Sequence, residues 1–346
     1  MKLSPFPVGP SACRSSRCAM PHRPLCPILL FFTCLSMSAV AFADDQSKTT
    51  QTKFEFDYGM RWEQLPEGKT ARFWTPLITS TPDQQVRRVA TQLPDGAKNV
   101  KETTDARFGN PLLYFELTPK SQPVVLKIKY HVVRTSSRTR EITSEESAMV
   151  QSHFLAPSSL VPLDPQLQKT IAPALSEKTD PYDLARQLYL AVNQHLTYGK
   201  PKGQPWGRGD ARWVCDSKTG NCTDYHSLFI ATCRSANIPA AFEIGFPIGK
   251  QDSGSVAGYH CWARFLHKDR WTPVDISEGD KNPELRDYFF GNLTADRVTV
   301  TVGRDLELRP KAAAGKVNYL VYPHVEVNGE VVSDVTLDVQ YQRAND

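Results

Sequence analysis

Three side chains whose types could together perform thiol acyl transfer follow one another in the middle of the chain. Cys222 opens the run Cys-Thr-Asp-Tyr-His, His260 lies in Gly-Tyr-His-Cys-Trp, and Asp275 ends Trp-Thr-Pro-Val-Asp. A cysteine nucleophile needs a base that takes its proton and an acidic group that orients the base. We therefore predict that these three residues form a catalytic triad.

The residues around Cys222 predict that its thiol stands at the start of a helix. Gly220 gives the backbone the freedom for a sharp entry, and the helix is expected over residues 222–236, before Pro239. Free N–H groups and the helix dipole lower the pKa of a thiol there and stabilise a developing oxyanion. The alternative interpretation is a buried structural cysteine.

His260 and Asp275 are expected on neighbouring strands. The strand-like segments 259–266 and 270–276 can pair as a hairpin, which would place the carboxylate beside the imidazole and fix its tautomer. His226 lies one turn beyond the thiol on the same helix and is the alternative base. We favour His260 because a spaced acidic residue follows it.

In their residues and their order along the chain, these motifs resemble those of the transglutaminase-like superfamily. They resemble its exported bacterial members more than the large calcium-dependent animal enzymes. The resemblance covers about residues 180–280 and rests on Gly-x-Cys-x-Asp, His-x-Trp and Trp-x-x-x-Asp. It implies a helix and sheet shared with papain-like folds, with Cys222 as nucleophile, His260 as base and Asp275 as orienting acid. The position two after the His-x-Trp tryptophan is often acidic in the family and is Arg264 here, which concerns the substrate cleft rather than the triad.

Three further residues are candidates for substrate binding. Trp206 and Trp213 lie in the loop expected over residues 200–220, where they would line an acyl-donor cleft or pack the loop itself. Asp224 would either shape the substrate site or act only as a favourable acidic residue in the first helical turn.

Zinc binding is a competing chemistry for the same part of the chain. Cys215, Cys222, His226 and Cys233 are residue types that bind zinc. Their spacing lacks the tight Cys-x-x-Cys pairs of common zinc sites. We therefore predict no metal site and no cofactor, since thiol acyl transfer needs none; calcium sites other than an EF-hand loop stay open.

Around these motifs the sequence predicts an α+β protein in three parts. Apolar and polar residues alternate at 54–58, 113–117 and 125–133, which predicts an N-terminal β-sandwich domain over residues 54–150. A proline-rich linker at 155–180 should lead to the transglutaminase-like core, over residues 180–280.

The core should begin with a helix from Pro181, capped by Asp180, whose apolar residues recur about once per turn as far as Leu196. A strand is expected at 240–248. A β-rich C-terminal extension over 281–346 is predicted to contain strands, at 298–302, 317–322 and 331–341.

Residues 1–43 have the pattern of a secretory signal peptide. Basic residues come first, an apolar run from Ile28 follows, and the segment ends in Ala-Phe-Ala. The run is too short and interrupted for a membrane span. We predict a secreted or periplasmic protein with no membrane span.

The net charge and the cysteines of the mature chain are counted without residues 1–43. The full chain carries 41 basic and 37 acidic residues, and removing the four basic residues of the signal makes the two numbers equal, which argues against nucleic-acid binding. Four cysteines remain, at 215, 222, 233 and 261. We expect Cys222 to be free and Cys215 to pair with Cys261, because export permits disulfides. Cys261 follows His260 in a strand, so its side chain should point to the opposite face from the catalytic histidine.

The predicted function is that of an exported cysteine-dependent enzyme acting on carboxamide or peptide bonds. Its substrate would be a protein or peptide, with cell-wall peptide among the possibilities, and the outcome would be hydrolysis, deamidation or amine crosslinking. The sequence does not choose among these, nor does it give the oligomeric state. The rival hypothesis is a non-catalytic module that uses the same fold to bind a surface polymer or protein.

Overall fold

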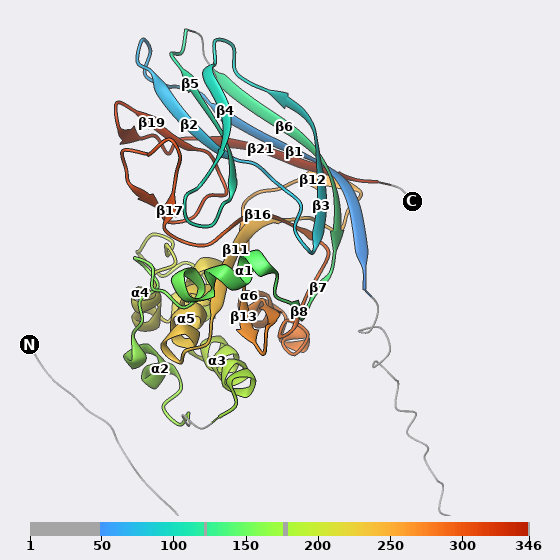
Figure 1. The fold of residues 1–346 in the computed structure, drawn as a ribbon, viewed down its shortest axis with the longest axis vertical. Helices are drawn as coiled ribbons and strands as arrows, with labels where there is room; N and C mark the ends of the chain where they lie inside the picture. The colour runs from blue at the N-terminus through green and yellow to red at the C-terminus, as the bar shows by residue number, and fades with distance from the viewer. Residues whose placement is uncertain (1–48, 121–122, 176–178, 345–346) are drawn as a thin grey trace, which may run out of the picture. The chain divides into compact units, whose positions relative to one another are not determined.

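The strands of the protein gather into three five-stranded antiparallel sheets, here called the first, second and core sheets. The structure is a computed structural model that describes residues 49–120, 123–175 and 179–344. Figure 1 shows the first and second sheets above a group of helices that pack on the core sheet.

The first sheet joins strands from both ends of the described chain. Its strands, in spatial order, are β12 (Ser253–Ser255), β21 (Thr336–Arg343), β1 (Gln51–Trp62), β6 (Val124–Thr135) and β3 (Gln84–Gln92). In β1, Phe54 lies opposite Arg343 of β21 on one side and Val132 of β6 on the other. Every second residue of β6 is buried, so one face of this sheet is apolar.

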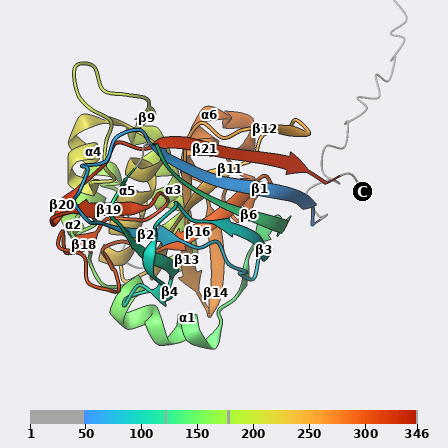
Figure 2. The same cartoon turned by 90° about the horizontal axis from the view of Figure 1, so that it is seen from above.

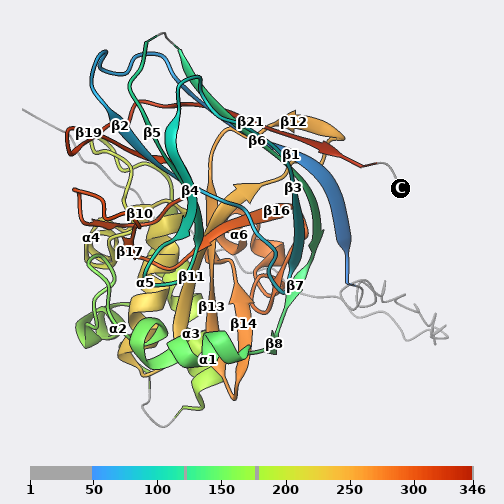
Figure 3. The ribbon, with the colours of Figure 1, turned by 45° about the horizontal axis from the view of Figure 1, so that its top comes forward.

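The second sheet packs its apolar face on the first and completes a sandwich (Figure 3). Its strands, in spatial order, are β20 (Glu330–Val331), β19 (His324–Val327), β2 (Ala71–Pro76), β5 (Pro111–Leu117) and β4 (Lys98–Thr104). The rings of Trp62 and Phe73 meet edge to face at 5.2 Å between centroids, and Phe73 stacks on Phe115 at 4.4 Å. Such pairs stabilise a core beyond the area that they bury.

The core sheet carries the helices that position the candidate site. Its strands, in spatial order, are β16 (Arg297–Val302), β11 (Ala240–Pro247), β13 (His260–His267), β14 (Arg270–Val274) and β8 (Arg140–Glu141). The helix α5 (Cys222–Ser235) packs on β13 and β11, and α3 (Pro181–His195) packs on α5. Figure 2, in which the molecule is seen from above, shows strands β21, β1 and β6 of the first sheet running across the core sheet.

The remaining elements are short. They are α1 (Ser144–Met149), the π-helical turn Val150–Phe154, α2 (Pro165–Ile171), α4 (Ala211–Ser217), α6 (Ile276–Lys281), the 3₁₀ turn Pro283–Leu285, and the strands β7 (Ser137–Arg138), β9 (Thr197–Tyr198), β10 (Thr219–Gly220), β15 (Asn292–Leu293), β17 (Leu306–Glu307) and β18 (Lys316–Val317).

The α+β class and most elements expected from the sequence are confirmed. Asp180 caps α3 by accepting a hydrogen bond from the backbone N–H of Tyr182, and Pro181 is its first residue. The helix expected at 222–236 begins at Cys222. The hairpin expected downstream is β13 paired with β14.

Three local expectations were wrong. The expected loop at 200–220 contains α4, which begins because Asp210 accepts hydrogen bonds from two backbone N–H groups of its first turn. The expected linker at 155–180 contains α2. Of the strand expected at 317–322, only Val317 lies in a strand, since β18 ends at that residue.

Three strands of the predicted C-terminal extension belong to the sheets of the predicted N-terminal domain. β21 lies between β1 and β12, and β19 pairs with β2 and with β20. These two stretches of sequence therefore share one sandwich, and each also gives one edge strand to the core sheet, β8 from the first stretch and β16 from the second.

The predicted signal peptide at residues 1–43 lies outside the described residues. In the described part of the chain, every helix is too short or too polar to cross a bilayer.

Candidate active site

The first turn of α5 presents the Cys222 thiol at a helix N-terminus. Asn221 caps the helix: its side-chain oxygen accepts hydrogen bonds from the N–H groups of Thr223 and Asp224, and the carboxylate of Asp224 accepts one from the Asn221 N–H. The residue before the cap is Gly220 because a Cβ there would lie 2.7 Å from the Asp224 Cβ. The glycine signal in the sequence therefore reflects close packing, and its backbone is ordinary.

The structure brings Cys222, His260 and Asp275 together in the expected order. His260 is the first residue of β13, and Asp275 follows β14 and caps α6. Nε2 of His260 lies 2.7 Å from Oδ2 of Asp275, which leaves Nδ1 as the ring nitrogen for the thiol. The Cys222 thiol and the His260 ring are close enough for each to shift the pKa of the other.

The electrostatics favour a thiolate–imidazolium pair. A hydrogen bond from the Cys261 thiol, together with the contact to His260, holds the pKa of Cys222 well below its usual range, although burial opposes this shift. Burial would lower the pKa of His260, but the charge and hydrogen bond of Asp275 and the contact with Cys222 outweigh it and raise that pKa to about 9. Opposite charges that lie close together stabilise one another.

Asp275 is fully buried and fully hydrogen-bonded. Its Oδ1 accepts from the Ser277 hydroxyl and the Glu278 backbone N–H, both at 3.1 Å, and its Oδ2 also accepts from Nη1 of Arg297 at 3.1 Å. Burial would raise the pKa of Asp275, but the charges of His260 and Arg297 hold it well below its usual range. The carboxylate is thus kept ionised beside the imidazole.

Sequence analysis missed Arg297. Its guanidinium lies 4.7 Å from the centre of the Trp262 ring as well as against Asp275. The signal available was a basic residue that opens the buried strand β16. A buried cation on a strand needs an acidic partner, but the sequence does not say which one.

His226, the alternative base, is held by the backbone. Its Nε2 accepts a hydrogen bond from the Ile276 N–H at 3.1 Å, so its proton is on Nδ1, which donates to the Cys222 carbonyl at 2.7 Å. Burial lowers the pKa of His226. This neutral imidazole joins α5 to α6 and has no nitrogen left to accept a proton from the thiol.

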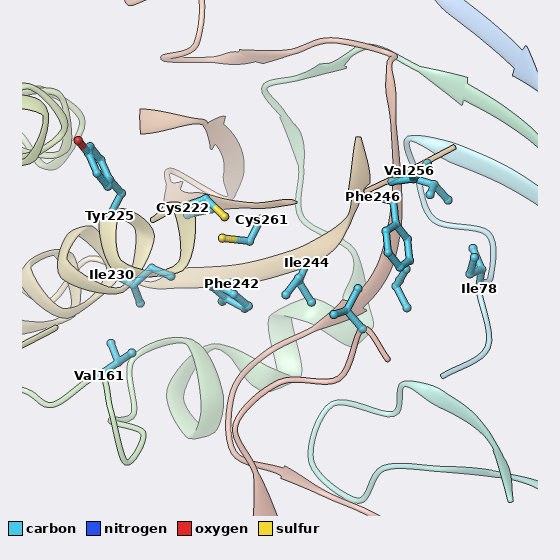
Figure 4. Packing of buried hydrophobic residues seen from close by; sticks show 14 of the residues in the cluster. Ile78, Val161, Cys222, Tyr225, Ile230, Phe242, Ile244, Phe246, Val256 and Cys261 are labelled. Atoms are coloured by element: carbon cyan, nitrogen blue, oxygen red, sulfur yellow. The ribbon is translucent and has the colours of Figure 1, made fainter. Parts of the chain in front are cut away.

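The predicted disulfide between Cys215 and Cys261 was wrong, whereas Cys222 is free as expected. All four cysteines of the described chain are free and buried. Cys261 was expected to point away from the site, but its sulfur faces that of Cys222 (Figure 4) and lies 3.6 Å from Nδ1 of His226. His260 is the first residue of β13. The alternating side-chain directions of a regular strand do not fix the direction of a ring at the very end of that strand.

The three candidate substrate residues lie near the N-terminus of α5 in different environments. Trp206 and Trp213 line one pocket of about 190 Å³, and the Gly207 carbonyl in its wall accepts a hydrogen bond from the Asn221 side chain. Asp224 is fully buried, and its carboxylate accepts hydrogen bonds from the N–H groups of Asn221 and Gly209. Asp224 therefore ties the loop to the helix, and burial raises its pKa to about 6.

Four half-buried tyrosines respond to the charge of the thiol. Burial raises the pKa of Tyr198, Tyr259, Tyr319 and Tyr322, and the charge of Cys222 adds to this rise. The hydroxyls of Tyr259 and Tyr319 are 3.2 Å apart. From the sequence, Tyr198 could be weighed as a cleft residue in the same way as Trp206 and Trp213, whereas the other three tyrosines were missed because they come from distant segments.

Arg264, the departure from the family pattern, lies within an ion-pair cluster. Its guanidinium contacts Glu146 of α1 at 3.1 Å and Glu243 of β11 at 2.5 Å. Glu243 also accepts a hydrogen bond from the indole N–H of Trp262. Arg264 therefore connects α1 to the core sheet.

No metal-binding cluster of side chains is found among the residues that the structure describes. No group of three or more His, Cys, Asp or Glu side chains there is placed to hold an ion, and this includes the four residues weighed for zinc.

The part of the chain that carries α3, α5 and β13 matches a known family. Residues 169–276 match the sequence model of the transglutaminase-like superfamily, and this stretch of the chain is a transglutaminase-like domain.

Comparisons with single proteins extend beyond that domain. An uncharacterized protein of Haemophilus influenzae is 24% identical over 313 residues, which cover 77% of this chain and 84% of the relative. A solved structure from Cytophaga hutchinsonii, described as a proposed cysteine protease, has the same fold with a TM-score of 0.56, 14% identity, and coverage of 86% of this chain and 94% of that one. The periplasmic domain of TgpA from Pseudomonas aeruginosa is similar at 15% identity, with a TM-score of 0.31 and coverage of 68% and 90%.

Proposed function

We propose that the protein is an exported cysteine-dependent acyl-transfer enzyme that acts on carboxamide or peptide bonds. The observation that carries this proposal is the meeting of Cys222, His260 and Asp275 at the N-terminus of α5. The His260 ring is hydrogen-bonded to the Asp275 carboxylate, and His260 and Cys222 are close enough for each to shift the pKa of the other. A transglutaminase-like domain over residues 169–276 supports the same class of enzyme. Export is part of the proposal and rests on the residue pattern of 1–43.

Each residue has a defined step in this reaction. The Cys222 thiolate attacks the carbonyl carbon, and the charge that develops on oxygen faces the N-terminus of α5. Asn221 takes the N–H groups of Thr223 and Asp224, which leaves the Cys222 N–H as the helix-end donor nearest the sulfur. Donors fixed before the reaction stabilise such an oxyanion without reorganisation.

His260 carries the proton in both halves of the reaction. As imidazolium it protonates the leaving amine, or ammonia from a carboxamide, and a thioester on Cys222 remains. As neutral imidazole it then takes a proton from water or an acceptor amine, which attacks the thioester and releases the product. Asp275 orients the ring and stabilises its charged form in the first step.

The pocket of Trp206 and Trp213 is proposed to hold part of the acyl donor. Leu160, Pro205 and the two tryptophans line it together with Arg208 and Asp210. It lies one hydrogen bond from the cap of α5, through Gly207 and Asn221. The indole of Trp206 is 48% exposed, and an exposed aromatic side chain in a pocket provides contact area for a peptide.

The proposal is tested by trapping the acyl-enzyme. Wild-type protein is incubated with peptide and cell-envelope extracts, quenched in acid and digested, and the Cys222 peptide is examined by mass spectrometry for an acyl adduct. We expect an adduct on Cys222 that disappears in Cys222→Ala, with turnover reduced by about 1,000-fold or more. Cys215→Ala is the matched control and should retain both.

The rival hypothesis of a binding module gives a different result. A non-catalytic groove would retain the extract component without covalent attachment, and Cys222→Ala would retain it equally well. Equal capture by both forms, with no adduct on Cys222, would contradict the enzyme proposal. The mass of the adduct and of the released product distinguishes hydrolysis or deamidation from crosslinking to an amine.

A further inference from the structure

Two thiols, not one, meet at the centre of this site. Cys222 opens α5, and Cys261 is the second residue of β13, the strand on which α5 packs. Each thiol shifts the pKa of the other, and the Cys261 sulfur lies 3.6 Å from Nδ1 of His226, which is one turn along α5 from Cys222. Figure 4 shows the two sulfur atoms turned toward one another between the helix and the strand.

Their surroundings make the two thiols chemically unequal. Cys222 is 3% exposed and Cys261 is completely buried. Burial, the hydrogen bond to Cys222 and the charge of its neighbour raise the pKa of Cys261 well above the usual range, whereas that of Cys222 is held well below it. A small oxidant that enters the site therefore meets one thiolate, at Cys222, and a protonated thiol behind it.

Oxidation of Cys222 removes the main electrostatic obstacle to reaction at Cys261. A sulfenic acid is neutral, so the negative charge that disfavours ionisation of Cys261 is lost. The guanidinium of Arg304, which favours the ionised form of Cys261, remains. The second thiol becomes the better nucleophile only after the first has been oxidised.

We propose that Cys261 is a resolving thiol that forms a reversible disulfide with Cys222 when a peroxide oxidises the site. The Cys222 thiolate attacks one peroxide oxygen, the O–O bond breaks, and with one proton the products are Cys222 sulfenic acid and water. Cys261 then attacks the sulfenic sulfur, its S–H proton leaves with the hydroxyl as a second water, and the S–S bond forms. In total, two thiols and one hydrogen peroxide give one disulfide and two waters.

The disulfide would have a protective function. Without a nearby thiol, a sulfenic acid is oxidised further to sulfinic and sulfonic acids, which thiol reductants do not restore. A disulfide withdraws the Cys222 sulfur from that sequence and returns it when a dithiol reductant is added. The proposal depends on the reactivity of these two sulfurs alone and does not require the acyl-transfer function.

Cys215 and Cys233 provide matched controls. Both are buried and free, but burial raises the pKa of each. Cys233 is near the other end of α5 from Cys222, and Cys215 is on α4. Neither has the facing thiolate that Cys261 has.

The test exposes reduced, full-length protein to a small excess of hydrogen peroxide. Free thiols are then blocked with iodoacetamide, and non-reduced peptides are analysed by mass spectrometry. A parallel sample is treated with dithiothreitol, and its Cys222 is labelled to measure the recovered fraction. Wild type should give a Cys222–Cys261 peptide and near-complete recovery.

Cys261→Ala should give no linked peptide, and its recovered fraction of reduced Cys222 should be about tenfold lower. Its Cys222 should carry sulfinic or sulfonic acid. Cys215→Ala and Cys233→Ala should behave as wild type. Thermal unfolding checks that each variant is folded, and Cys261→Ser is the second variant if alanine destabilises the core.

Three results would overturn the proposal. One is equal over-oxidation of Cys222 in wild type and Cys261→Ala, another is a linkage of Cys222 to any other cysteine, and the third is full recovery in the absence of Cys261. Acyl-enzyme trapping on the reduced protein is measured separately, so a failure of the proposed function and a failure of the redox proposal give different results.

Discussion

Arg297 and Asp275 form a buried ion pair directly behind the candidate base. Nη1 of Arg297 lies 3.1 Å from Oδ2 of Asp275, the same oxygen that faces His260. Both side chains are almost completely buried. Arg297 therefore fixes the orientation of the carboxylate and is a positioning residue.

Replacement of Arg297 by Met should move acid unfolding to higher pH. The pKa of Asp275 is depressed in the folded state, so its stabilisation is present above the unfolded value and is lost as pH falls through the folded value. Removing one cation raises that folded pKa, and a broken buried pair costs about 3–5 kcal/mol. The acid midpoint is measured by circular dichroism.

The control is Arg212→Met, which breaks the exposed pair of Arg212 with Asp164 and should leave the acid midpoint unchanged. Arg297→Lys should lie between wild type and Arg297→Met. An unchanged midpoint in Arg297→Met would show that the pair does not hold the charge of Asp275.

Replacement of Asp275 by Asn should remove the thiolate at neutral pH. The raised pKa of His260, about 9, depends on the negative charge of Asp275, and Asn keeps the shape but not the charge. The rate of iodoacetamide reaction with Cys222 at pH 7 should fall by roughly 100-fold. This corresponds to about two pKa units, since one pKa unit is a factor of ten. Asp183→Asn, an exposed residue of α3, should keep the wild-type rate.

The alkylation rate of wild-type Cys222 should be nearly independent of pH between 7 and about 8.5. Its pKa is well below the usual 9.0, so the thiolate is already formed, whereas a small free thiol measured alongside should react faster as pH rises. Turnover of a substrate should instead decline above about pH 9, because His260 then loses the proton needed by the leaving group. A tenfold rise in alkylation per pH unit through this range would rule out the ion pair.

Replacement of Asp224 by Ala should destabilise the protein through the hydrogen bonds that its carboxylate accepts, and not through the Cys222 sulfur. The N–H groups of Asn221 and Gly209 would lose their acceptor, and an unsatisfied buried donor costs about 1–3 kcal/mol. Thermal unfolding of Asp224→Ala should occur several degrees lower than in wild type. Asp216→Ala, on the exposed face of α4, serves as the comparison and should unfold like wild type.

Most of what the sequence could predict depended on local signals. The cap and first turn of α5, the hairpin of β13 and β14, and the cap of α3 are each encoded within a few residues. Cys222, His260 and Asp275 meet because two such local units pack on one another. The domain class follows from the same short patterns.

The parts that were missed depend on contacts between distant segments. Arg297 and Tyr319 reach the site from segments beyond the matched domain, which ends at residue 276, and nothing near them in sequence names their partners. The direction of Cys261 was misjudged because strand alternation describes the interior of a strand, whereas β13 begins one residue earlier, at His260. Packing, rather than pattern, decides such cases.

The pairing of β1 with β21 has a consequence for synthesis on the ribosome. Phe54 and Arg343 lie opposite each other in the first sheet, yet the whole transglutaminase-like domain is translated between them. One side of β1 therefore stays without its partner strand while the intervening chain is made. An unpaired apolar strand is a site of aggregation, so the nascent protein should depend on chaperone binding until β21 has emerged.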